Sequence, residues 1–312
     1  MKTIVLSCFD GLSGLQIALR KLGIKVDKYY ASEVDESAMT ITMKHFPNTI
    51  QLGDIRKITP KMIEKNPTLI AAGSPCQDFS LGGLRKGMVT KENVAVTSLD
   101  QYLKLKSEGF KFDEKSQSYL FWEFVRLVRQ LKPKYFFLEN VRMDHVWMHV
   151  ISRELGVFPI NINSSLVSAQ NRDRLYWTNI PGLSAPKDKG ILLGNVIPGA
   201  VGGFGKRGRN VGEKKRDGSI KWTPYSTTRT DKKANCVVTK KGNTTMVMMK
   251  NGTHRQLTVE EAEQLQTLPK NYTKVDGVSN VGRWHAIGNG WTIDVITHLL
   301  KGLKKDLVKR KK

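Results

Sequence analysis

The sequence predicts an α/β fold: a Rossmann-like, mixed, mostly parallel sheet covered by helices on both faces, with a small, irregular, β-rich second region. Three observations lead to this prediction. Apolar β-rich runs alternate with helix-period segments from residue 1 to about 180, glycines and acidic side chains follow several of these runs, and the composition changes after residue 181. At 312 residues and 35.2 kDa, the chain is long enough for one large domain and a smaller one.

The first region opens as a βαβ unit. Leu15, Ala18, Leu19 and Leu22 recur at helical spacing after the first expected strand, and Gly23 follows as the expected helix end. This spacing turns one apolar helix face toward the sheet. Seven apolar, β-rich segments are the expected strands: residues 4–8, 29–32, 50–52, 69–72, 135–138, 160–163 and 175–177.

The second region, residues 182–255, has a different composition. It contains 12 glycines, and 16 lysines and arginines against four acidic residues. Residues 199–218 are too rich in glycine and lysine to bury much surface, so we expect a loop there. Residues 235–239 and 244–249 are expected to form short strands.

Beyond residue 256 the helical pattern returns. Val259, Ala262 and Leu265 recur at helical spacing, and an amphipathic segment spans residues 291–303 before a basic tail. We expect this last part of the chain to return to the first domain. The expected division is therefore 1–181, 182–255 and 256–312.

The net charge indicates which class of binding partner to expect. With 51 lysines and arginines against 28 acidic residues, the formal charge is +23, which indicates a polyanion, nucleic acid first and a membrane surface second. No apolar run approaches the ~20 residues of a membrane span, and the first nine residues lead into a strand-like segment without a signal-peptide pattern. A soluble, cytoplasmic protein is expected.

Cysteine usage leaves a thiol available for chemistry. The three cysteines are too few and too scattered for a disulfide framework or a zinc site, and no metal is expected. A lone cysteine is more often a small buried hydrophobe than a nucleophile. Cys76, however, follows Pro75 just beyond an expected strand, where a side chain is displayed rather than packed. Arg172 or Arg174 would stabilise its thiolate.

Polar residues after the other strands favour an adenosine-bearing ligand without a diphosphate. The turn Asp10-Gly11-Leu12-Ser13-Gly14 lets a ligand approach the backbone, but it lacks the glycine spacing of a pyrophosphate site. Glu33 suits a carboxylate that accepts both ribose hydroxyls, and Asp54 suits a contact to the adenine amine. Each acid alone is equally consistent with a solvated loop residue. The glycine turn and the two acids together predict the adenosine-bearing ligand.

Six motifs, in order from residue 4 to about residue 300, resemble those of the cytosine-5 DNA methyltransferase family. They are Phe9-Asp10-Gly11-Leu12-Ser13-Gly14, Pro75-Cys76, Glu139-Asn140-Val141, Gln170-Asn171-Arg172-Asp173-Arg174, Arg255-Gln256-Leu257-Thr258 with Glu261 and Leu268-Pro269, and Gly288-Asn289-Gly290. The family usually has Ser or Ala, Val and Pro after the last Asn, whereas this chain has Gly290-Trp291-Thr292. That departure, with Ser32-Glu33-Val34, is similar to the animal de novo enzymes, although a bacterial or phage type is expected.

The resemblance implies an S-adenosylmethionine-dependent methyltransferase, with S-adenosylhomocysteine as product. Cys76 would add to carbon 6 of a flipped-out cytosine, and Glu139 would hold the ring nitrogen and the exocyclic amine. Arg172 or Arg174 would lie near the carbonyl oxygen. The residues expected to bind S-adenosylmethionine are Phe9, Asp10, Gly11, Gly14, Glu33, Val34, Asp54, Ile55, Gly73, Pro75, Asn289, Gly290 and Trp291.

The resemblance also implies double-stranded DNA as the partner, with residues 182–255 as the target recognition domain. Residues 80–118 resemble the flexible loop that closes over the flipped base, and the insertion at 89–115 is longer than the family's usual linker. A monomer is expected, with a separate cognate restriction endonuclease as a candidate partner. The expected DNA contacts are Ser80, Gly83, Arg85, Lys86, Arg207, Arg209, Arg229, Lys240 and Arg255.

Three alternative functions stay open at this point. A tRNA cytosine-5 methyltransferase shares the catalytic motifs, but that branch usually carries a Cys-Phe-Thr insertion that this chain lacks. A catalytically inert DNA-binding homologue is disfavoured by intact Cys76, Glu139 and Arg172. An oxidoreductase on a dinucleotide fold is disfavoured by the incomplete phosphate pattern.

Overall fold

The computed structural model divides the chain into two compact units. Unit 1 contains Met1–Ile162, Asp173–Pro186 and Val295–Lys312, and unit 2 contains Asn163–Arg172 and Lys187–Asp294. Unit 2 therefore contains most of residues 182–255, together with residues 163–172 and 256–294. The structure describes residues 2–75, 79, 88–92, 94–112, 117–206, 211–214, 217, 219–223, 226–240, 242 and 245–309.

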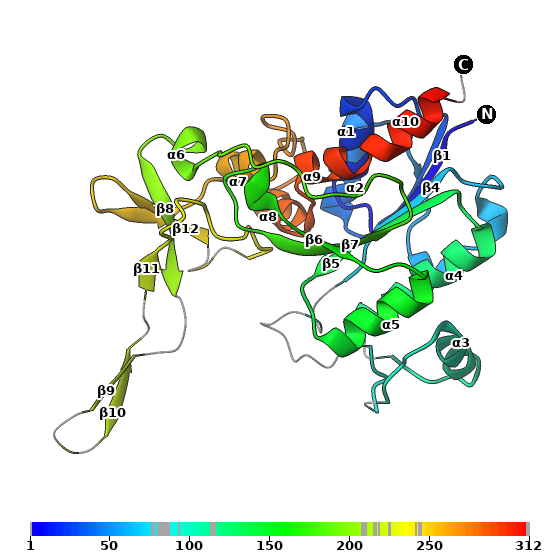
Figure 1. Cartoon of the computed structure of the whole chain (residues 1–312), viewed down its shortest axis with the longest axis horizontal. Helices are drawn as coiled ribbons and strands as arrows, with labels where there is room; N and C mark the ends of the chain where they lie inside the picture. Colours follow the sequence, from blue (N-terminus) through cyan, green and yellow to red (C-terminus); the bar gives the residue numbers. More distant parts are fainter. Residues whose placement is uncertain are drawn as a thin grey trace. The chain divides into compact units, whose positions relative to one another are not determined.

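A seven-stranded sheet forms the centre of unit 1 (Figure 1). Its order is β3-β2-β1-β4-β5-β7-β6, in which β1 to β5 are parallel and β7 runs antiparallel to β5. The mixed, mostly parallel sheet predicted from the sequence is confirmed, and each predicted strand is present. The strands are β1 (Ile4–Cys8), β2 (Lys28–Ser32), β3 (Ile50–Gln51), β4 (Leu69–Gly73), β5 (Tyr135–Val141), β6 (Ile160–Asn163) and β7 (Asp173–Thr178).

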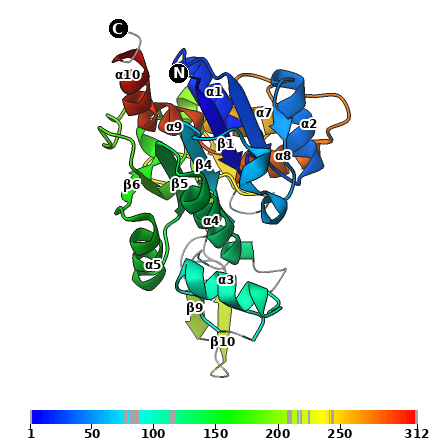
Figure 2. The same ribbon diagram turned by 90° about the vertical axis from the view of Figure 1, so that its right-hand side faces the viewer.

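Helices cover both faces of this sheet. Side chains alternate between the faces along a strand, so Leu6 of β1 and Ile70 of β4 join Trp122 and Phe124 in one core cluster. That cluster is the core beneath α4 and α5. Figures 1 and 2 show α1 (Gly14–Lys21), α2 (Glu36–His45) and α10 (Lys301–Lys309) on one face, and α4 (Phe121–Leu131) and α5 (His145–Leu155) on the other.

The helix α1 has the face and the end that the sequence predicts. Leu15, Ala18 and Leu19 are buried against the sheet. Gly23 follows the last turn with φ +67°, a left-handed conformation that glycine adopts without steric cost. The helix starts directly at the turn after β1, which fixes the direction of that turn.

The insertion between β4 and α4 contains a helix, α3 (Leu99–Ser107), that the sequence pattern did not indicate. Its partner is a buried acid, Glu123 of α4, which is fully inaccessible to solvent. Glu123 accepts hydrogen bonds from the Tyr102 hydroxyl at 2.7 Å and from Arg126 Nε at 2.6 Å, and it pairs with Lys106. Because a buried carboxylate needs such donors, this cluster fixes α3 to α4.

Unit 2 contains two separate sheets, and the loop predicted at residues 199–218 is wrong. Most of that segment forms two strands, and its glycines permit close strand packing. A Cβ on Gly202 would lie 2.7 Å from the Arg229 carbonyl oxygen, and one on Gly203 would lie 2.6 Å from the Asn235 nitrogen. The first sheet has the order β11-β8-β12-β13, built from β8 (Ala200–Lys206), β11 (Ser226–Thr228), β12 (Met246–Met249) and β13 (His254–Gln256), and the second pairs β9 (Val211–Lys214) with β10 (Ile220–Thr223).

The strand predicted at residues 235–239 is also wrong, because side chains take the backbone groups that a ladder would use. The Val237 nitrogen donates to Gln170 Oε1 at 2.8 Å, and the Val237 oxygen accepts from Arg172 at 2.9 Å. The Val238 oxygen accepts from the Trp284 indole. The other predicted strand, at 244–249, is present as β12.

The remaining helices are divided between the two units. Val259, Ala262 and Leu265 are buried on α7, as predicted, and Thr258 and Glu261 form its capping box. The predicted amphipathic segment at 291–303 is two helices rather than one. Among the described residues, no helix has the length and apolar character to cross a bilayer. The helices are α6 (Leu193–Val196), α7 (Val259–Leu265), α8 (Asn280–Asn289) and α9 (Ile293–Leu299), followed by α10.

We predict that Gly302→Ala destabilises the protein although Gly302 lies in a helix, where alanine is normally favoured by about 0.5–1 kcal/mol. A Cβ at Gly302 would lie 1.9 Å from the Pro181 carbonyl oxygen, so α10 must move away from the segment that follows β7. We expect a loss of about 1–3 kcal/mol in the free energy of unfolding, measured with urea. Gly242→Ala, which has open space, is the control. A stabilised Gly302→Ala protein contradicts this packing.

Candidate active site

The carboxyl ends of the parallel strands in unit 1 carry most of the predicted site residues. In a sheet of this kind ligands bind beyond these ends, where the strand order reverses. Here the reversal lies between β1 and β4, which are neighbours in the sheet but not in the chain. Four segments meet at this edge, namely the turn after β1, Glu33 after β2, Ser74 after β4 and Glu139 near the end of β5.

The turn after β1 is held in an unusual conformation. Phe9, Gly11 and Ser13 have φ values of +57°, +57° and +60°, so two side-chain-bearing residues occupy the left-handed region. A Cβ on Gly11 would meet no atom within 4 Å, which leaves the backbone open to a ligand. Gly14 starts α1 and is buried. The predicted glycine turn is therefore present.

Glu33 organises this turn through three backbone N–H groups. Its Oε2 accepts from the Gly11 nitrogen at 2.7 Å, and its Oε1 accepts from Val34 and Asp35 at 2.8 and 2.9 Å. The carboxylate thus connects the end of β2 to the turn after β1. A carboxylate offers about four acceptor positions, so it retains capacity for a ligand hydroxyl.

Asp10 lies beneath the same turn and is 8% exposed. The Tyr29 hydroxyl donates to Oδ1 at 2.6 Å, and the Ser13 hydroxyl donates to Oδ2 at 2.7 Å. Burial raises the pKa of Asp10 to about 6, well above its ordinary value. Because both oxygens accept from protein groups, Asp10 supports the turn from below.

Asp54 follows β3 and is bonded to a cation. Its carboxylate makes an ion pair of 2.6 Å with Arg56, and this hydrogen bond lowers the pKa of Asp54. Ile55 is buried, whereas Val34 is 69% exposed beside Glu33. The structure thus brings Glu33, Asp54 and the β1 turn to one edge of one sheet.

The segment that contains Cys76, the candidate nucleophile, has described contacts before and after it. Cys76 lies outside the described residues, as do Ser80, Gly83, Arg85 and Lys86. Before it, Ser74 accepts a hydrogen bond of 3.0 Å at its Oγ from Asn140 Nδ2. After it, Phe79 is buried, and its ring contacts Trp147 of α5 edge to face at 6.1 Å between centroids. These contacts were not predicted from the sequence, although Asn140 belongs to the motif Glu139-Asn140-Val141.

Glu139 and Arg174 form a nearly buried ion pair. Arg174 Nε donates to Glu139 Oε1 at 2.8 Å, and the two side chains are 15% and 11% exposed. In the register of β4 with β5, Glu139 lies opposite Gly73, three residues before Cys76. The acid and the nucleophile segment therefore come from neighbouring strands, and Arg174 comes from β7 on the other side of β5.

Arg172 occupies a different environment, inside unit 2. Its guanidinium is 5% exposed and donates to the carbonyl oxygens of Val237, Gly288 and Gly290 at 2.9, 3.3 and 3.0 Å. Gln266 also donates to Gly290 at 2.9 Å. Of the two arginines named from the sequence, Arg174 is the one bonded to Glu139, and Arg172 holds the backbone around residues 288–290.

The closing motif lies at the end of α8. Asn289 is exposed and its amide is 3.4 Å from the His285 ring, Gly290 is the buried acceptor for Arg172, and Trp291 is half-buried. The roles of these residues stay predictions.

Three of the predicted DNA contacts are described, all in unit 2. Arg229 pairs with Asp231, and Arg255 makes a two-point ion pair with Glu261 at 2.7 and 2.8 Å. Lys240 is exposed. Arg207 and Arg209 lie outside the described residues. Arg255 therefore braces the start of α7 as well as reaching the surface.

Comparisons with known proteins identify relatives over most of the chain. The family model described as C-5 cytosine-specific DNA methylase matches residues 3–145 and 199–305. Type II methyltransferase M1.ScrFI of Lactococcus lactis subsp. cremoris is 24% identical over 343 residues, covering 99% of this chain and 79% of that protein. Orphan methyltransferase M.SPRI of Bacillus phage SPR is 27% identical over 192 residues, covering 57% of this chain and 38% of that protein. The chain thus spans under half the length of this phage relative.

Solved structures share the fold at lower identity. A variant of Spodoptera frugiperda DNMT2 has a TM-score of 0.64 and 18% identity, covering 97% of this chain and 99% of that one. A putative DNA modification methyltransferase from a prophage of E. coli has a TM-score of 0.64 and 17% identity, covering 98% and 100%. The α/β fold and the family resemblance predicted from the sequence are confirmed. The chain belongs to the C-5 cytosine-specific DNA methylase family.

Proposed function

We propose that this protein transfers a methyl group to carbon 5 of a cytosine in duplex DNA. The observation that carries the proposal is the pairing of β4 with β5, which sets the Glu139–Arg174 ion pair beside the strand leading into Pro75-Cys76. Membership of the family supports the same reaction.

The edge of unit 1 fits S-adenosylmethionine better than a dinucleotide. Glu33 lies there with acceptor capacity to spare, and a carboxylate attracts a cationic nucleoside and repels a diphosphate. We assign the ligand to the turn at residues 9–14, with Glu33 and Asp54 beside it. When bound, S-adenosylmethionine supplies the methyl group as a substituent of a positively charged sulfur.

Cytosine needs activation because carbon 5 is a poor nucleophile while the ring is aromatic. In the proposed sequence the Cys76 thiolate forms a bond to carbon 6, and the ring electrons shift toward carbon 5 and the carbonyl. Glu139 holds the ring nitrogen and the exocyclic amine, and Arg174 meets the charge that develops near the carbonyl oxygen. After methylation, carbon 5 loses its proton to water, and the thiolate leaves carbon 6.

The DNA-contacting part of the proposal rests on charge. A base within a duplex must be flipped out to meet Cys76, at a cost of a few kcal/mol. Residues 182–255 carry 16 lysines and arginines against four acids, which suits the phosphate backbone of a duplex around a flipped base. We propose this segment as the target recognition domain of a monomeric cytoplasmic enzyme. The proposal covers the transferase alone, without a cognate endonuclease.

We predict that Glu139→Gln lowers kcat for methyl transfer about 100- to 10,000-fold, because it removes a group that acts in the transition state. Cys76→Ala should abolish transfer. The measurement is transfer of labelled methyl from S-adenosylmethionine to duplex DNA, with bisulfite sequencing to locate the product. Glu36→Gln, an exposed acid at the same edge, is the control and should stay within about twofold. Methylation of tRNA but not of DNA would replace this proposal with the RNA alternative.

We predict that Asp10 makes the protein less stable as the pH rises through about 6. Its folded pKa lies above the ordinary 3.8, so the folded state binds the proton more tightly, and its stabilising effect is lost above pH 6. Asp10→Asn removes this titration. Between pH 5 and pH 8 the wild type should lose about 1 kcal/mol of unfolding free energy relative to the variant. A constant difference between the two proteins would contradict the assignment.

A further inference from the structure

Lysines gather at the edge of the unit 1 sheet where the parallel strands begin. This edge is opposite to the one that carries the candidate site. Lys2, Lys25, Lys65 and Lys132 are exposed and precede β1, β2, β4 and β5 by at most four residues. Because parallel strands start at one edge, these four residues, the amino-edge lysines, share one side of the unit.

Bonds between the loops make this edge one continuous surface. Glu64, before β4, pairs with Lys2 at 3.1 Å and with Lys28 at 2.7 Å, so the starts of three strands meet around one carboxylate. Backbone hydrogen bonds also link neighbouring strand starts: Asp27 to Thr3 at 2.9 Å, Thr68 to Ile4 at 2.7 Å and Lys134 to Pro67 at 3.1 Å.

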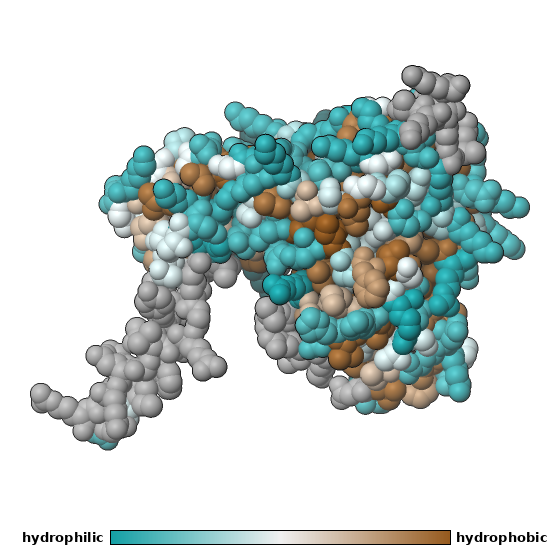
Figure 3. Space-filling view, viewed as in Figure 1, coloured by the Kyte–Doolittle hydropathy of each residue, from teal (hydrophilic) through white to brown (hydrophobic). Residues whose placement is uncertain are grey.

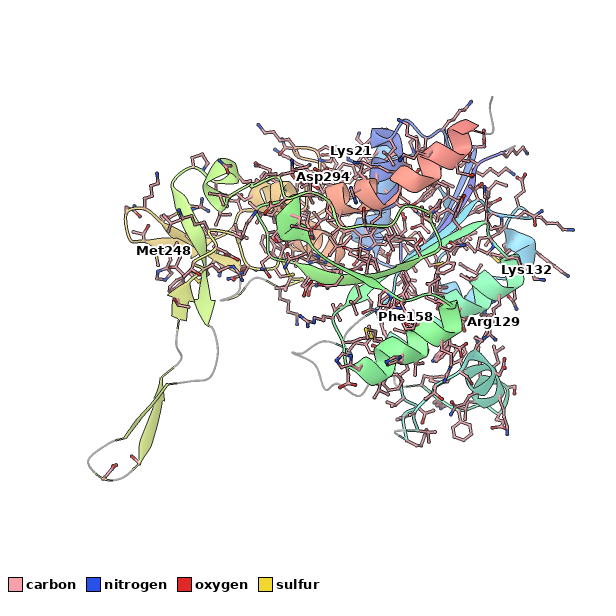
Figure 4. The ribbon with its side chains drawn as sticks, in the orientation of Figure 1. Lys21, Arg129, Lys132, Phe158, Met248 and Asp294 are labelled. Carbon is pink, nitrogen blue, oxygen red and sulfur yellow. The ribbon has the colours of Figure 1, made fainter. Side chains whose placement is uncertain are left out.

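The helix α10 extends the positive surface. Its Asp306 pairs with Lys134, just before β5, which places this helix at the same edge. Lys301, Lys304 and Lys305 of α10 are exposed. Figures 1 and 2 show the start of β1 and the end of α10 close together, and in Figure 3 the coloured surface over α10 is mostly hydrophilic. Figure 4 labels Lys132 just beyond the end of α4.

The acids at this edge offset only part of the positive charge. Glu64 and Asp306 are each bonded to lysines, and Asp27 accepts from the Thr3 nitrogen at 2.8 Å. The opposite edge, in contrast, carries Glu33 and Glu139. The exposed Lys25, Lys65 and Lys132 thus lie at the edge of unit 1 opposite to the candidate site.

We propose that the amino-edge lysines and α10 form a second, sequence-independent binding surface for the phosphate backbone of duplex DNA. Lysines bind phosphates as point charges without reading bases, which suits such a role. A membrane surface is disfavoured because binding to bilayers also uses an apolar face, and Leu303 of α10 is fully buried in the unit. The enzyme would then bind DNA at a second surface besides its active site. The choice of DNA as the polyanion rests on the proposed function.

The test compares two variants of the full chain that lose equal charge. The first is Lys25→Gln, Lys65→Gln, Lys132→Gln, and the control is Lys61→Gln, Lys270→Gln, Lys274→Gln, three exposed lysines outside residues 80–118 and 182–255. Affinity for a 30-base-pair duplex is measured by anisotropy over a series of KCl concentrations. Each lost phosphate contact reduces the slope of log K against log salt by about 0.9.

We expect the first variant to lose about two to three units of this slope, and the control less than one. Capture of a labelled second duplex by protein on a bead-bound duplex should fall several-fold only in the first variant. Equal changes in both variants would overturn the proposal. So would loss of binding to phosphatidylserine vesicles with an unchanged DNA slope. Failure of methyl transfer in the wild type overturns the proposed function instead, because the slope measures binding alone.

Discussion

The parallel pairing of β4 with β5 is the constraint on which the candidate site depends. Its register sets Gly73 opposite Glu139, so the nucleophile segment and the acid leave the sheet side by side. Side chains alternate along a strand, and a slip of one residue would turn Glu139 to the other face. The next residue, Asn140, then reaches Ser74 and fixes the approach to Cys76. Arg174 is added from β7, which pairs with the other side of β5.

Much of unit 1 could be predicted from the sequence because its signals are local. Strands buried on both faces are short apolar runs, and each predicted run corresponds to a strand. The structure of unit 2 was harder to predict, because its glycines are compatible both with loops and with closely packed strands. Gly202 and Gly203 indicate a loop by composition, yet in the structure they allow β8 to pack closely against residues 229–235. The extended segment at 235–238 has no ladder because its partners are side chains distant in the sequence.

The site residues could be predicted by type and position, but their partners could not. Arg172 and Arg174 are two residues apart in one motif, yet one bonds carbonyl groups of residues more than 60 positions away and the other bonds Glu139. Glu33 was predicted to hold a ribose, and its hydrogen bond from the Gly11 nitrogen depends on the turn after β1, 22 residues earlier in the chain. Such contacts depend on tertiary structure. Composition and spacing carry no direct signal for them.

Charge is distributed so that the two kinds of ligand meet different surfaces. In the proposed account, the acidic edge of unit 1 receives a cationic methyl donor, and the lysines at the opposite edge and in residues 182–255 meet phosphates. The net charge of +23 is thus compatible with an acidic site.

Covalent trapping tests the central claim most directly. A duplex with 5-fluorocytosine in the methylated context keeps the thiolate adduct, because fluorine cannot leave carbon 5 as the proton does. After incubation with S-adenosylmethionine and this duplex, the account predicts a covalent protein–DNA complex whose digested peptide carries the modification on Cys76. An adduct on Cys8 or Cys236, or no adduct from a protein that methylates unmodified DNA, would contradict it.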